Sequence, residues 1–310
     1  MKTIVFLDRG TLSADMPRFS FPHRWIEYPS TAPAEVVERC HGAQIVVTNK
    51  VPLSREALLQ LPELELIAVP AAGVNHLDLE TSRERGIGVV TCAGYSTISV
   101  PEHAFALMMA LRRNLVPYWR DVHKGGWSGS PTFYAELHPV ADLYGSTLGI
   151  VGSGHGGKRI AQLAEAFGMR VLLADRRNAA ALRPGYTAFD DVLRESDVIS
   201  LHCPLTDDTR HLFGIREFEL MKRTASLVNT ARGGIVDEAA LAEALDRKLI
   251  ANAALDVLEQ EPAAQNHPLL RTARADLLVT PHVAWRTDVA MTRLVKQLTD
   301  GIEAHYAHAA

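Results

Sequence analysis

Short apolar, β-rich runs alternate with helical patterns along almost the whole chain. A parallel sheet is expected from this alternation, because each strand must return to the same edge through a crossover that is usually a helix. In the first third, buried strands are predicted at Ile4–Leu7, Ile45–Thr48, Leu66–Val69 and Val89–Thr91, separated by helical stretches near Pro33–Cys40, Arg55–Leu61 and Leu77–Arg85.

A second series of strands follows a long apolar helix near Ser96–Arg113, for which Ser99 is the predicted N-cap. The final segment, Val289–His305, is helical without a strand of its own, so it is expected to pack on the first domain. The second series matches a full dinucleotide-binding sheet, with strands predicted at Thr147–Val151, Arg170–Ala174, Val198–Leu201, Ser226–Asn229, Asn252–Leu255 and Leu277–Thr280.

The predicted fold is therefore α/β, with two doubly wound parallel-sheet domains of Rossmann-like or flavodoxin-like type. The first domain is discontinuous and comprises residues 1–98 and 288–310; it is the expected substrate-binding domain. Residues 99–287 form the expected NAD-binding domain. A chain of 310 residues is long for a single core, which agrees with this division.

Composition excludes several classes of function. The net charge of −4 offers no basic surface for nucleic acid or for an anionic membrane. No apolar run approaches the roughly 18 residues of a membrane span. The three cysteines, Cys40, Cys92 and Cys203, have neither a disulfide framework nor zinc-site spacing. No metal is predicted, and a cytoplasmic location is expected.

Gly152, Gly154 and Gly157 have the G-x-G-x-x-G spacing between a predicted strand and a predicted helix. Such a turn brings the pyrophosphate of a dinucleotide to the helix N-terminus. The next strand ends in Asp175, where a carboxylate meets the adenosine ribose hydroxyls, so NAD is the predicted cofactor. Arg176 and Arg177 are either solvated charges or ligands of a 2′-phosphate, which leaves NADP open.

Arg232, Glu261 and His282 each follow a predicted strand of the second sheet. Singly, each is more often a surface or structural residue, but ligands of parallel sheets bind at the carboxyl edge, where all three are expected. His282 is predicted to exchange a proton with the substrate oxygen, and Glu261 to orient the imidazole and favour its protonated form. Arg232 is predicted to bind a carboxylate and polarise a carbonyl. Asp256 either approaches the nicotinamide amide or caps a turn.

These residues resemble the D-isomer-specific 2-hydroxyacid dehydrogenases over essentially the whole chain. Besides the glycine turn with Asp175, the motifs that carry the resemblance are Ala72-Gly73-Val74-Asn75, Ser99-Val100-Pro101-Glu102-His103, His202-Cys203-Pro204-Leu205-Thr206, Asn229-Thr230-Ala231-Arg232-Gly233-Gly234, Leu255-Asp256-Val257 with Glu261-Pro262, and Pro281-His282. The resemblance implies that Arg232, Glu261 and His282 are catalytic.

The resemblance also implies a homodimer formed through the cofactor domains. The substrate would be bound by Ala72, Gly73, Val74, Arg232 and His282, with Trp285 either shaping the pocket or packing between domains. The implied cofactor contacts are Gly152, Gly154, His155, Gly156, Gly157, Asp175, Arg176, Cys203, Pro204, Thr209, Thr230, Ala231, Arg232, Asp256, His282 and Ala284.

Within the family, three segments look most like the glycerate dehydrogenases, also called hydroxypyruvate reductases: Gly94-Tyr95-Ser96-Thr97, Ser130-Pro131-Thr132-Phe133 and His282-Val283-Ala284-Trp285. The expected activity is NAD(H)-dependent reduction of hydroxypyruvate to D-glycerate, and of glyoxylate to glycolate. The alternatives are oxidation of phosphoglycerate, D-lactate, formate or phosphite, and a non-catalytic NADH-sensing role like that of corepressors. One departure is His155-Gly156, where the family usually has Arg-Ile, so a possible pyrophosphate contact is missing.

Overall fold

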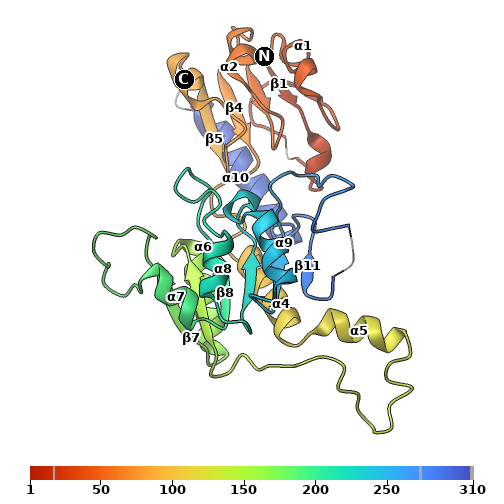
Figure 1. The fold of residues 1–310 in the computed structure, drawn as a ribbon. Helices are drawn as coiled ribbons and strands as arrows, with labels where there is room; N and C mark the ends of the chain where they lie inside the picture. The colour runs from red at the N-terminus through yellow and green to blue at the C-terminus, as the bar shows by residue number, and fades with distance from the viewer. Residues whose placement is uncertain (17, 272–273, 308–310) are drawn as a thin grey trace. The chain divides into compact units, whose positions relative to one another are not determined.

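The computed structural model describes residues 1–16, 18–271 and 274–307. The chain divides into two units, Met1–Ser96 with Arg286–Ala310 (unit 1) and Thr97–Trp285 (unit 2), whose elements are labelled in Figure 1. Residues 308–310 of the predicted first domain lie outside the described residues. Within the described ranges, no helix combines the length and the apolar character needed to cross a membrane.

Unit 1 contains a five-stranded parallel sheet in the order β2-β1-β3-β4-β5. Its central strands β3 and β4 are wholly buried, as expected when helices cover both faces. The strands are β1 (Lys2–Phe6), β2 (His23–Glu27), β3 (Ile45–Val47), β4 (Leu66–Val69) and β5 (Gly88–Thr91).

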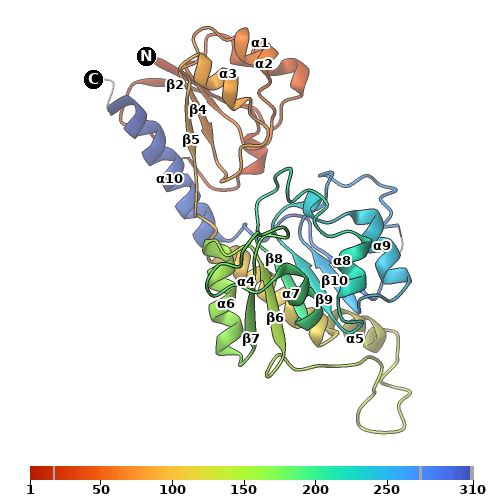
Figure 2. The same cartoon turned by 60° about the vertical axis from the view of Figure 1, so that its left-hand side comes forward.

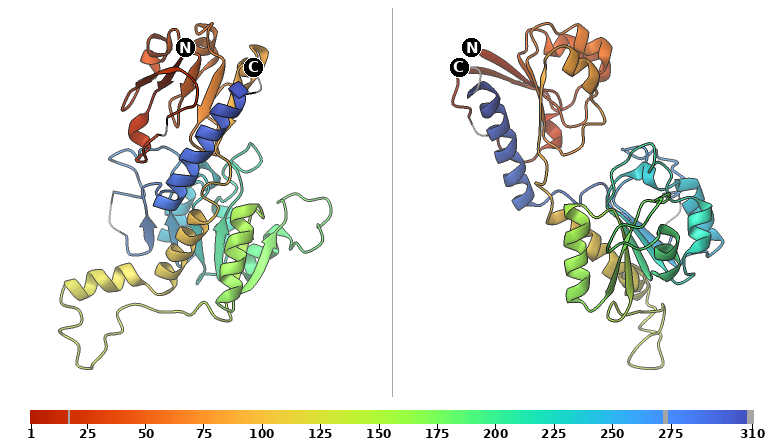
Figure 3. Two further views of the ribbon diagram at one scale, coloured as in Figure 1. Left: turned by 180° about the vertical axis from the view of Figure 1, so that it is seen from behind. Right: turned by 90° about the vertical axis from the view of Figure 1, so that its left-hand side faces the viewer.

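Short helices and one long helix cover the two faces of this sheet (Figure 3). One face carries α1 (Val36–Cys40), α2 (Arg55–Leu59) and α3 (Leu79–Glu84), with the 3₁₀ helices η1 (Arg9–Thr11) and η2 (Pro33–Glu35) in the loops. The opposite face carries α10 (Asp288–Ala307), which packs on β4 and β5. The Cys92 thiol donates a hydrogen bond to the Leu294 carbonyl at 3.5 Å, so the C-terminal helix belongs to unit 1.

Unit 2 contains a six-stranded parallel sheet in the order β11-β10-β9-β8-β6-β7 (Figure 2). The order reverses at β6, whose neighbours are β7 and β8, and ligands of such sheets bind at this switch point. The strands are β6 (Thr147–Val151), β7 (Arg170–Ala174), β8 (Val198–Leu201), β9 (Ser226–Asn229), β10 (Asn252–Leu255) and β11 (Leu277–Val279).

Successive residues of β6 enter different cores, because side chains alternate across a strand. Ile150 packs in the core under α4 (Ser99–Arg112) and α6 (His155–Ala166). Val151 packs in the core under the helices of the other face, which are α7 (Phe189–Glu195), α8 (Ile215–Leu220) and α9 (Glu238–Asp246), with the 3₁₀ turn η3 (Gly233–Ile235). The predicted doubly wound α/β class is confirmed for both sheets.

Three local differences from the sequence-based expectations have clear causes. Strand β2 was not predicted, because His23–Glu27 is a partly exposed edge strand in a polar sequence. Ser99 is the first residue of α4 and Ile98 is its N-cap, so the prediction of Ser99 as N-cap is wrong. Helix α6 begins at His155 rather than at the predicted Lys158, so the last three residues of the glycine turn, His155, Gly156 and Gly157, belong to its first turn.

Candidate active site

The glycine turn after β6 is shaped by two close backbone approaches. Gly152 has φ +103°, and a Cβ at this position would overlap the backbone of His202 and Cys203 at the end of β8. A Cβ at Gly157 would overlap the carbonyl oxygen of Gly152. A Cβ at Gly154, in contrast, would have no atom of the described residues within 4 Å, apart from its own chain neighbours. The turn is therefore tight where the protein packs on itself and open at the start of α6, where a pyrophosphate fits.

Neighbouring strand ends carry other residues that are predicted to contact the cofactor. The Thr230 hydroxyl after β9 is buried and has no hydrogen-bond partner among the described residues, as expected of a group that can serve a ligand. The Thr209 hydroxyl instead closes its own loop by donating to the Pro204 carbonyl at 2.7 Å. Burial raises the pKa of the Cys203 thiol to about 11, so the thiol is neutral beside the turn. His155, at the start of α6, is exposed.

Asp175 directly follows β7, and its carboxylate is almost fully buried. The groups that contact this carboxylate are hydrogen-bond donors. The backbone N–H groups of Arg176 and Arg183 donate at 2.8 Å each, and Arg183 Nε donates at 2.7 Å. The Arg183 amide is the main cause of a lowered Asp175 pKa, and the carboxyl is therefore ionised. Arg183 was missed in the sequence because it lies in a loop with no motif. Arg177, a suspected phosphate ligand, pairs with Glu217 at 2.5 Å.

His282 and Glu261 form a direct pair, with His282 Nδ1 2.6 Å from Glu261 Oε2. Glu261 is held from the other side, because its Oε1 accepts the Leu258 N–H at 3.0 Å. The second ring nitrogen of His282, Nε2, has no partner among the described residues, and a quarter of the side chain is exposed. An imidazole oriented at one nitrogen and available at the other can exchange a proton with a ligand.

Arg232 lies on the neighbouring loop, between β9 and η3. A Cβ at Gly233 would overlap the Leu258 backbone, so this glycine brings the Arg232 loop against the loop that carries Glu261. The Arg232 guanidinium donates to the Ala231 carbonyl at 2.7 Å. In the described part of the chain, no carboxylate lies within 4 Å of it. An arginine without a carboxylate partner next to a His–Glu pair can bind an anionic ligand.

Asp256 holds the backbone that carries His282. Its Oδ1 accepts the Val283 N–H at 3.0 Å, its Oδ2 accepts the Ala284 N–H at 2.9 Å, and its backbone carbonyl accepts the His282 N–H at 2.8 Å. His282 itself has φ +52°, an uncommon conformation for a residue with a side chain. Asp256 therefore caps the loop, which is one of the two roles that its position in the sequence left open.

Two further residues support this cap. The Thr280 hydroxyl donates to Asp256 Oδ1 at 2.5 Å, and His103 Nε2, from α4, lies 3.1 Å from Thr280 Oγ1 and 3.5 Å from Asp256 Oδ1. His103 lies in the Ser99-Val100-Pro101-Glu102-His103 motif, and Thr280 is the last residue of a predicted strand; the sequence assigned a role to neither. Trp285 is also tied to the loop, because its Nε1 donates to the His282 carbonyl at 2.8 Å.

In unit 1, the loop after β4 carries the residues predicted to bind a carboxylate. The backbone N–H groups of Ala72, Gly73 and Val74 have no acceptor within the described part of the chain. Consecutive free amides are a common anion-binding arrangement. Arg9, in the same unit, serves its own loop, because its guanidinium donates to the carbonyls of Leu12 and Ala14.

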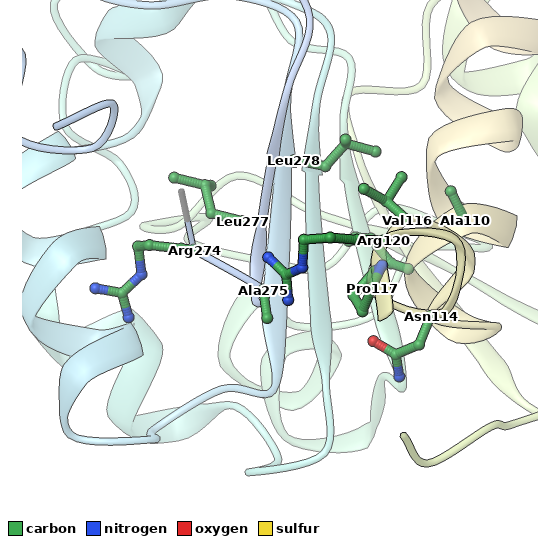
Figure 4. Close-up of a pocket in the computed structure, with 10 residues that line it drawn as sticks. Ala110, Asn114, Val116, Pro117, Arg120, Arg274, Ala275, Leu277 and Leu278 are labelled. Atoms are coloured by element: carbon green, nitrogen blue, oxygen red, sulfur yellow. The ribbon is translucent and has the colours of Figure 1, made fainter. Parts of the chain in front are cut away.

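A small pocket of unit 2 lies away from these residues (Figure 4). It is lined by the end of α4, by Asn114 to Arg120, and by Arg274 to Leu278 at the start of β11, whereas His282 follows the end of that strand. Its two arginines are paired, Arg120 with Asp121 and Arg274 with Asp246 and Asp276. It therefore offers no unpaired charge for chemistry.

Comparison with known proteins identifies the family. Residues 105–284 match the model described as the NAD-binding domain of D-isomer specific 2-hydroxyacid dehydrogenases. The chain is 47% identical to glycerate dehydrogenase of Methylorubrum extorquens over 307 residues, which are 99% of this chain and 96% of that protein. The chain belongs to the D-isomer specific 2-hydroxyacid dehydrogenase family.

Other members of this family give the same picture. Hydroxypyruvate reductase of Blautia hydrogenotrophica is 34% identical over 87% of this chain and 84% of its own. The crystal structure of D-lactate dehydrogenase from Aquifex aeolicus, complexed with NAD and lactic acid, has a TM-score of 0.80 at 28% identity, covering 98% of this chain and 96% of that one. The predicted family, the NAD(P) cofactor and the D-2-hydroxyacid dehydrogenase activity are confirmed.

Proposed function

We propose that this D-2-hydroxyacid dehydrogenase reduces hydroxypyruvate to D-glycerate, and glyoxylate to glycolate. The observation that carries the proposal is the His282–Glu261 pair at 2.6 Å, beside an arginine without a carboxylate partner, in a chain similar to glycerate dehydrogenase over 99% of its length. A 2-keto acid has the two groups that this set serves, a carbonyl that takes up a proton and a carboxylate that needs a cation.

A nicotinamide cofactor held at the glycine turn would supply the hydride that the carbonyl carbon takes up. His282 donates the Nε2 proton to the carbonyl oxygen, which becomes the hydroxyl, and takes it back in the reverse direction. Glu261 accepts the Nδ1 hydrogen bond and stabilises the charged ring before the proton leaves. Arg232 binds the substrate carboxylate and polarises the carbonyl.

The cofactor contacts remain the predicted ones, and several gain support from the geometry. Gly154 is open, Thr230 has an unpartnered hydroxyl, and Ala284 is fixed by Asp256. Both carboxylate oxygens of Asp256 already accept hydrogen bonds, so we propose that it acts mainly by positioning the His282 loop. Any contact with the nicotinamide amide would share these oxygens.

For the substrate, we propose contacts with the free amides of Ala72, Gly73 and Val74 and with the Trp285 indole. The three amides have no other acceptor among the described residues, and a keto-acid carboxylate can take up several N–H donors. The Trp285 indole is anchored to the His282 carbonyl, so its ring is held next to the proposed acid.

We also propose a homodimer formed through unit 2. Helix α5 (Leu115–His123) and the following loop form an arm, residues 115–144, which Figure 1 shows beyond the sheet of that unit. Its exposed apolar side chains include Trp119 at 64%, Phe133 at 90% and Tyr144 at 82%. Apolar surface of this extent is typical of an interface. Light scattering after size-exclusion chromatography tests the proposed homodimer, with Trp119→Asp and Phe133→Asp expected to give monomers.

A cytoplasmic location stays a prediction.

The proposed function is tested by the loss of NADH absorbance with hydroxypyruvate, glyoxylate, pyruvate and phosphohydroxypyruvate. Hydroxypyruvate is expected to have the highest kcat/KM. A higher value for another acid would keep the mechanism and replace the substrate. His282→Asn should lower kcat by about 10²- to 10⁴-fold.

The chain offers a matched control for that variant. His267 forms a second histidine–glutamate pair, with Nε2 2.8 Å from Glu238 Oε2, and is almost buried. His267→Asn should lower stability and leave kcat within about three-fold, since a structural pair stabilises the fold alone. Retention of full turnover by His282→Asn would overturn the proposed acid.

A further inference from the structure

The carboxylate expected at the adenosine ribose is already neutralised by an arginine. Arg183 donates to Asp175 twice, through its backbone N–H at 2.8 Å and through Nε at 2.7 Å. The other two guanidinium nitrogens of Arg183 make no hydrogen bond within the described chain, and 48% of the side chain is exposed. One edge of the guanidinium therefore holds Asp175, and the other edge is available.

Arg183 is fixed in place by the glycine turn itself. Its guanidinium stacks on the Tyr186 ring, with 3.7 Å between the guanidinium carbon and the ring centroid. The Tyr186 hydroxyl lies 2.5 Å from the Ser153 hydroxyl, and Ser153 stands between the first two glycines of the turn. Asp175, Arg183 and Tyr186 thus form a connected wall beside the turn, from the end of β7 to the end of β6.

The other two arginines of this loop are placed differently. Arg177 is committed to the buried carboxylate of Glu217. Arg176 is exposed, and its side chain has no hydrogen bond in the described residues. Only its backbone N–H reaches Asp175. Arg183 is therefore the arginine whose charged group is held at the Asp175 carboxylate, although it is eight residues further along the chain.

We propose that Asp175 and Arg183 form a dual subsite that accepts both NAD(H) and NADP(H). The ribose hydroxyls of NAD(H) share the Asp175 oxygens with the Arg176 and Arg183 donors, and the available edge of Arg183 binds the 2′-phosphate of NADP(H). A lone aspartate repels this phosphate, but a paired arginine cancels the repulsion and presents a planar fork that suits phosphate oxygens. The inference rests on the proposed position of the adenosine ribose at the end of β7 and is independent of the keto acid.

The test measures binding without turnover, by calorimetric titration of ADP-ribose and 2′-phospho-ADP-ribose. The unmodified enzyme is expected to bind the two ligands within about 10-fold of each other. Arg183→Gln should weaken binding of the phosphorylated ligand by about 10- to 100-fold, the loss of a charge-assisted contact, and change ADP-ribose binding by less than about three-fold. Thermal unfolding of each variant checks that the loop remains folded.

Matched variants separate the possible outcomes. Arg177→Gln, whose arginine is committed to Glu217, should leave the ratio of the two affinities unchanged. If Arg176→Gln changes the ratio and Arg183→Gln does not, the assignment to Arg183 is wrong. An equal loss of both ligands in Arg183→Gln, or binding of the phosphorylated ligand more than about 1,000-fold weaker in the unmodified enzyme, would also overturn it.

A fourth variant tests the ribose position on which the inference rests. Asp175→Ala should weaken ADP-ribose by at least about 10-fold. If it does not, the proposed ribose position fails, and the inference fails with it. If Asp175→Ala has this effect while Arg183→Gln leaves the ratio unchanged, the ribose position stands and only the dual subsite is wrong.

Discussion

The turns that follow β1 in unit 1 and β6 in unit 2 occupy equivalent places in two sheets and are built in opposite ways. Each of these strands is the first of its sheet along the chain, and it lies between the second and the third: β1 between β2 and β3, and β6 between β7 and β8. After β6, Gly154 is open and the 12-residue helix α6 begins. After β1, the chain enters the three-residue helix η1, and Asp8 accepts the backbone N–H groups of Asn49 at 2.9 Å and Lys50 at 2.7 Å.

In unit 1, the Asp8 carboxylate therefore occupies the place after the first strand. In unit 2, the equivalent place is open to an anion from a ligand. In each parallel sheet, the carboxyl ends of the strands lie at the same edge. The strand order therefore locates a potential site in each sheet. The residues of the loops decide which edge can bind a dinucleotide. Fold alone does not assign function, and within this chain the two sheets illustrate why.

The largest expected effect is on catalysis, and it distinguishes Arg232 of unit 2 from Arg9 of unit 1. Arg232→Gln should lower kcat/KM for hydroxypyruvate by about 10³-fold, because it removes a cation that binds the substrate and stabilises the developing charge. Arg9→Gln in unit 1 should lower the melting temperature and change kcat/KM by less than about three-fold, since Arg9 serves carbonyls of its own loop. Steady-state kinetics check both, and equal effects would remove the distinction.

A second prediction compares two glycines of the unit 2 turn. Gly157→Ala should lower both stability and NADH affinity, because its Cβ overlaps the Gly152 carbonyl oxygen. Gly154→Ala should keep the melting temperature and weaken NADH by about 10- to 100-fold, since its Cβ meets only a bound pyrophosphate. Fluorescence titration of NADH and thermal unfolding measure the two effects. Unchanged affinity in Gly154→Ala would contradict the proposed phosphate position.

A third prediction pairs two buried aspartates that each accept two backbone N–H groups. Asp8→Ala and Asp256→Ala should each lower the free energy of unfolding by about 2–3 kcal/mol, because buried donors are left unsatisfied. Only Asp256→Ala should also lower kcat, by about 10- to 100-fold, since it releases the His282 loop. Chemical denaturation and kinetics check this, and loss of stability alone at Asp256 would reject its positioning role.

The smallest expected effect concerns pH. Burial lowers the pKa of His202 to about 4, below its ordinary value near 6.5. The unfolded chain then binds more protons than the folded one between these values, so stability falls as the pH drops from 6.5 towards 4. Between pH 7 and pH 5, the free energy of unfolding should fall by about 2 kcal/mol less in His202→Asn than in the unmodified protein.

The matching histidine in unit 1 is His76, whose pKa burial also lowers. His76→Asn should likewise flatten the pH dependence, but less than His202→Asn. Denaturation at several pH values tests both variants, and an unchanged slope in His202→Asn would contradict the neutral buried ring.

The sequence by itself was sufficient to predict the alternating strands and helices, the glycine turn and the strand-end positions of Arg232, Glu261 and His282. These features depend on local patterns, namely periodicity, glycine spacing and the residue that follows each strand. Strand β2 escaped because an edge strand in polar sequence has no such pattern.

Only the tertiary structure decided which side chains meet. The 2.6 Å pair of His282 with Glu261, the cap of Asp256 on Val283 and Ala284, and the ion pair of Asp175 with Arg183 all depend on how loops of irregular backbone fold back. Loop conformation is fixed by long-range contacts, such as the approach of Gly233 to Leu258, and these leave no periodic signal in the chain.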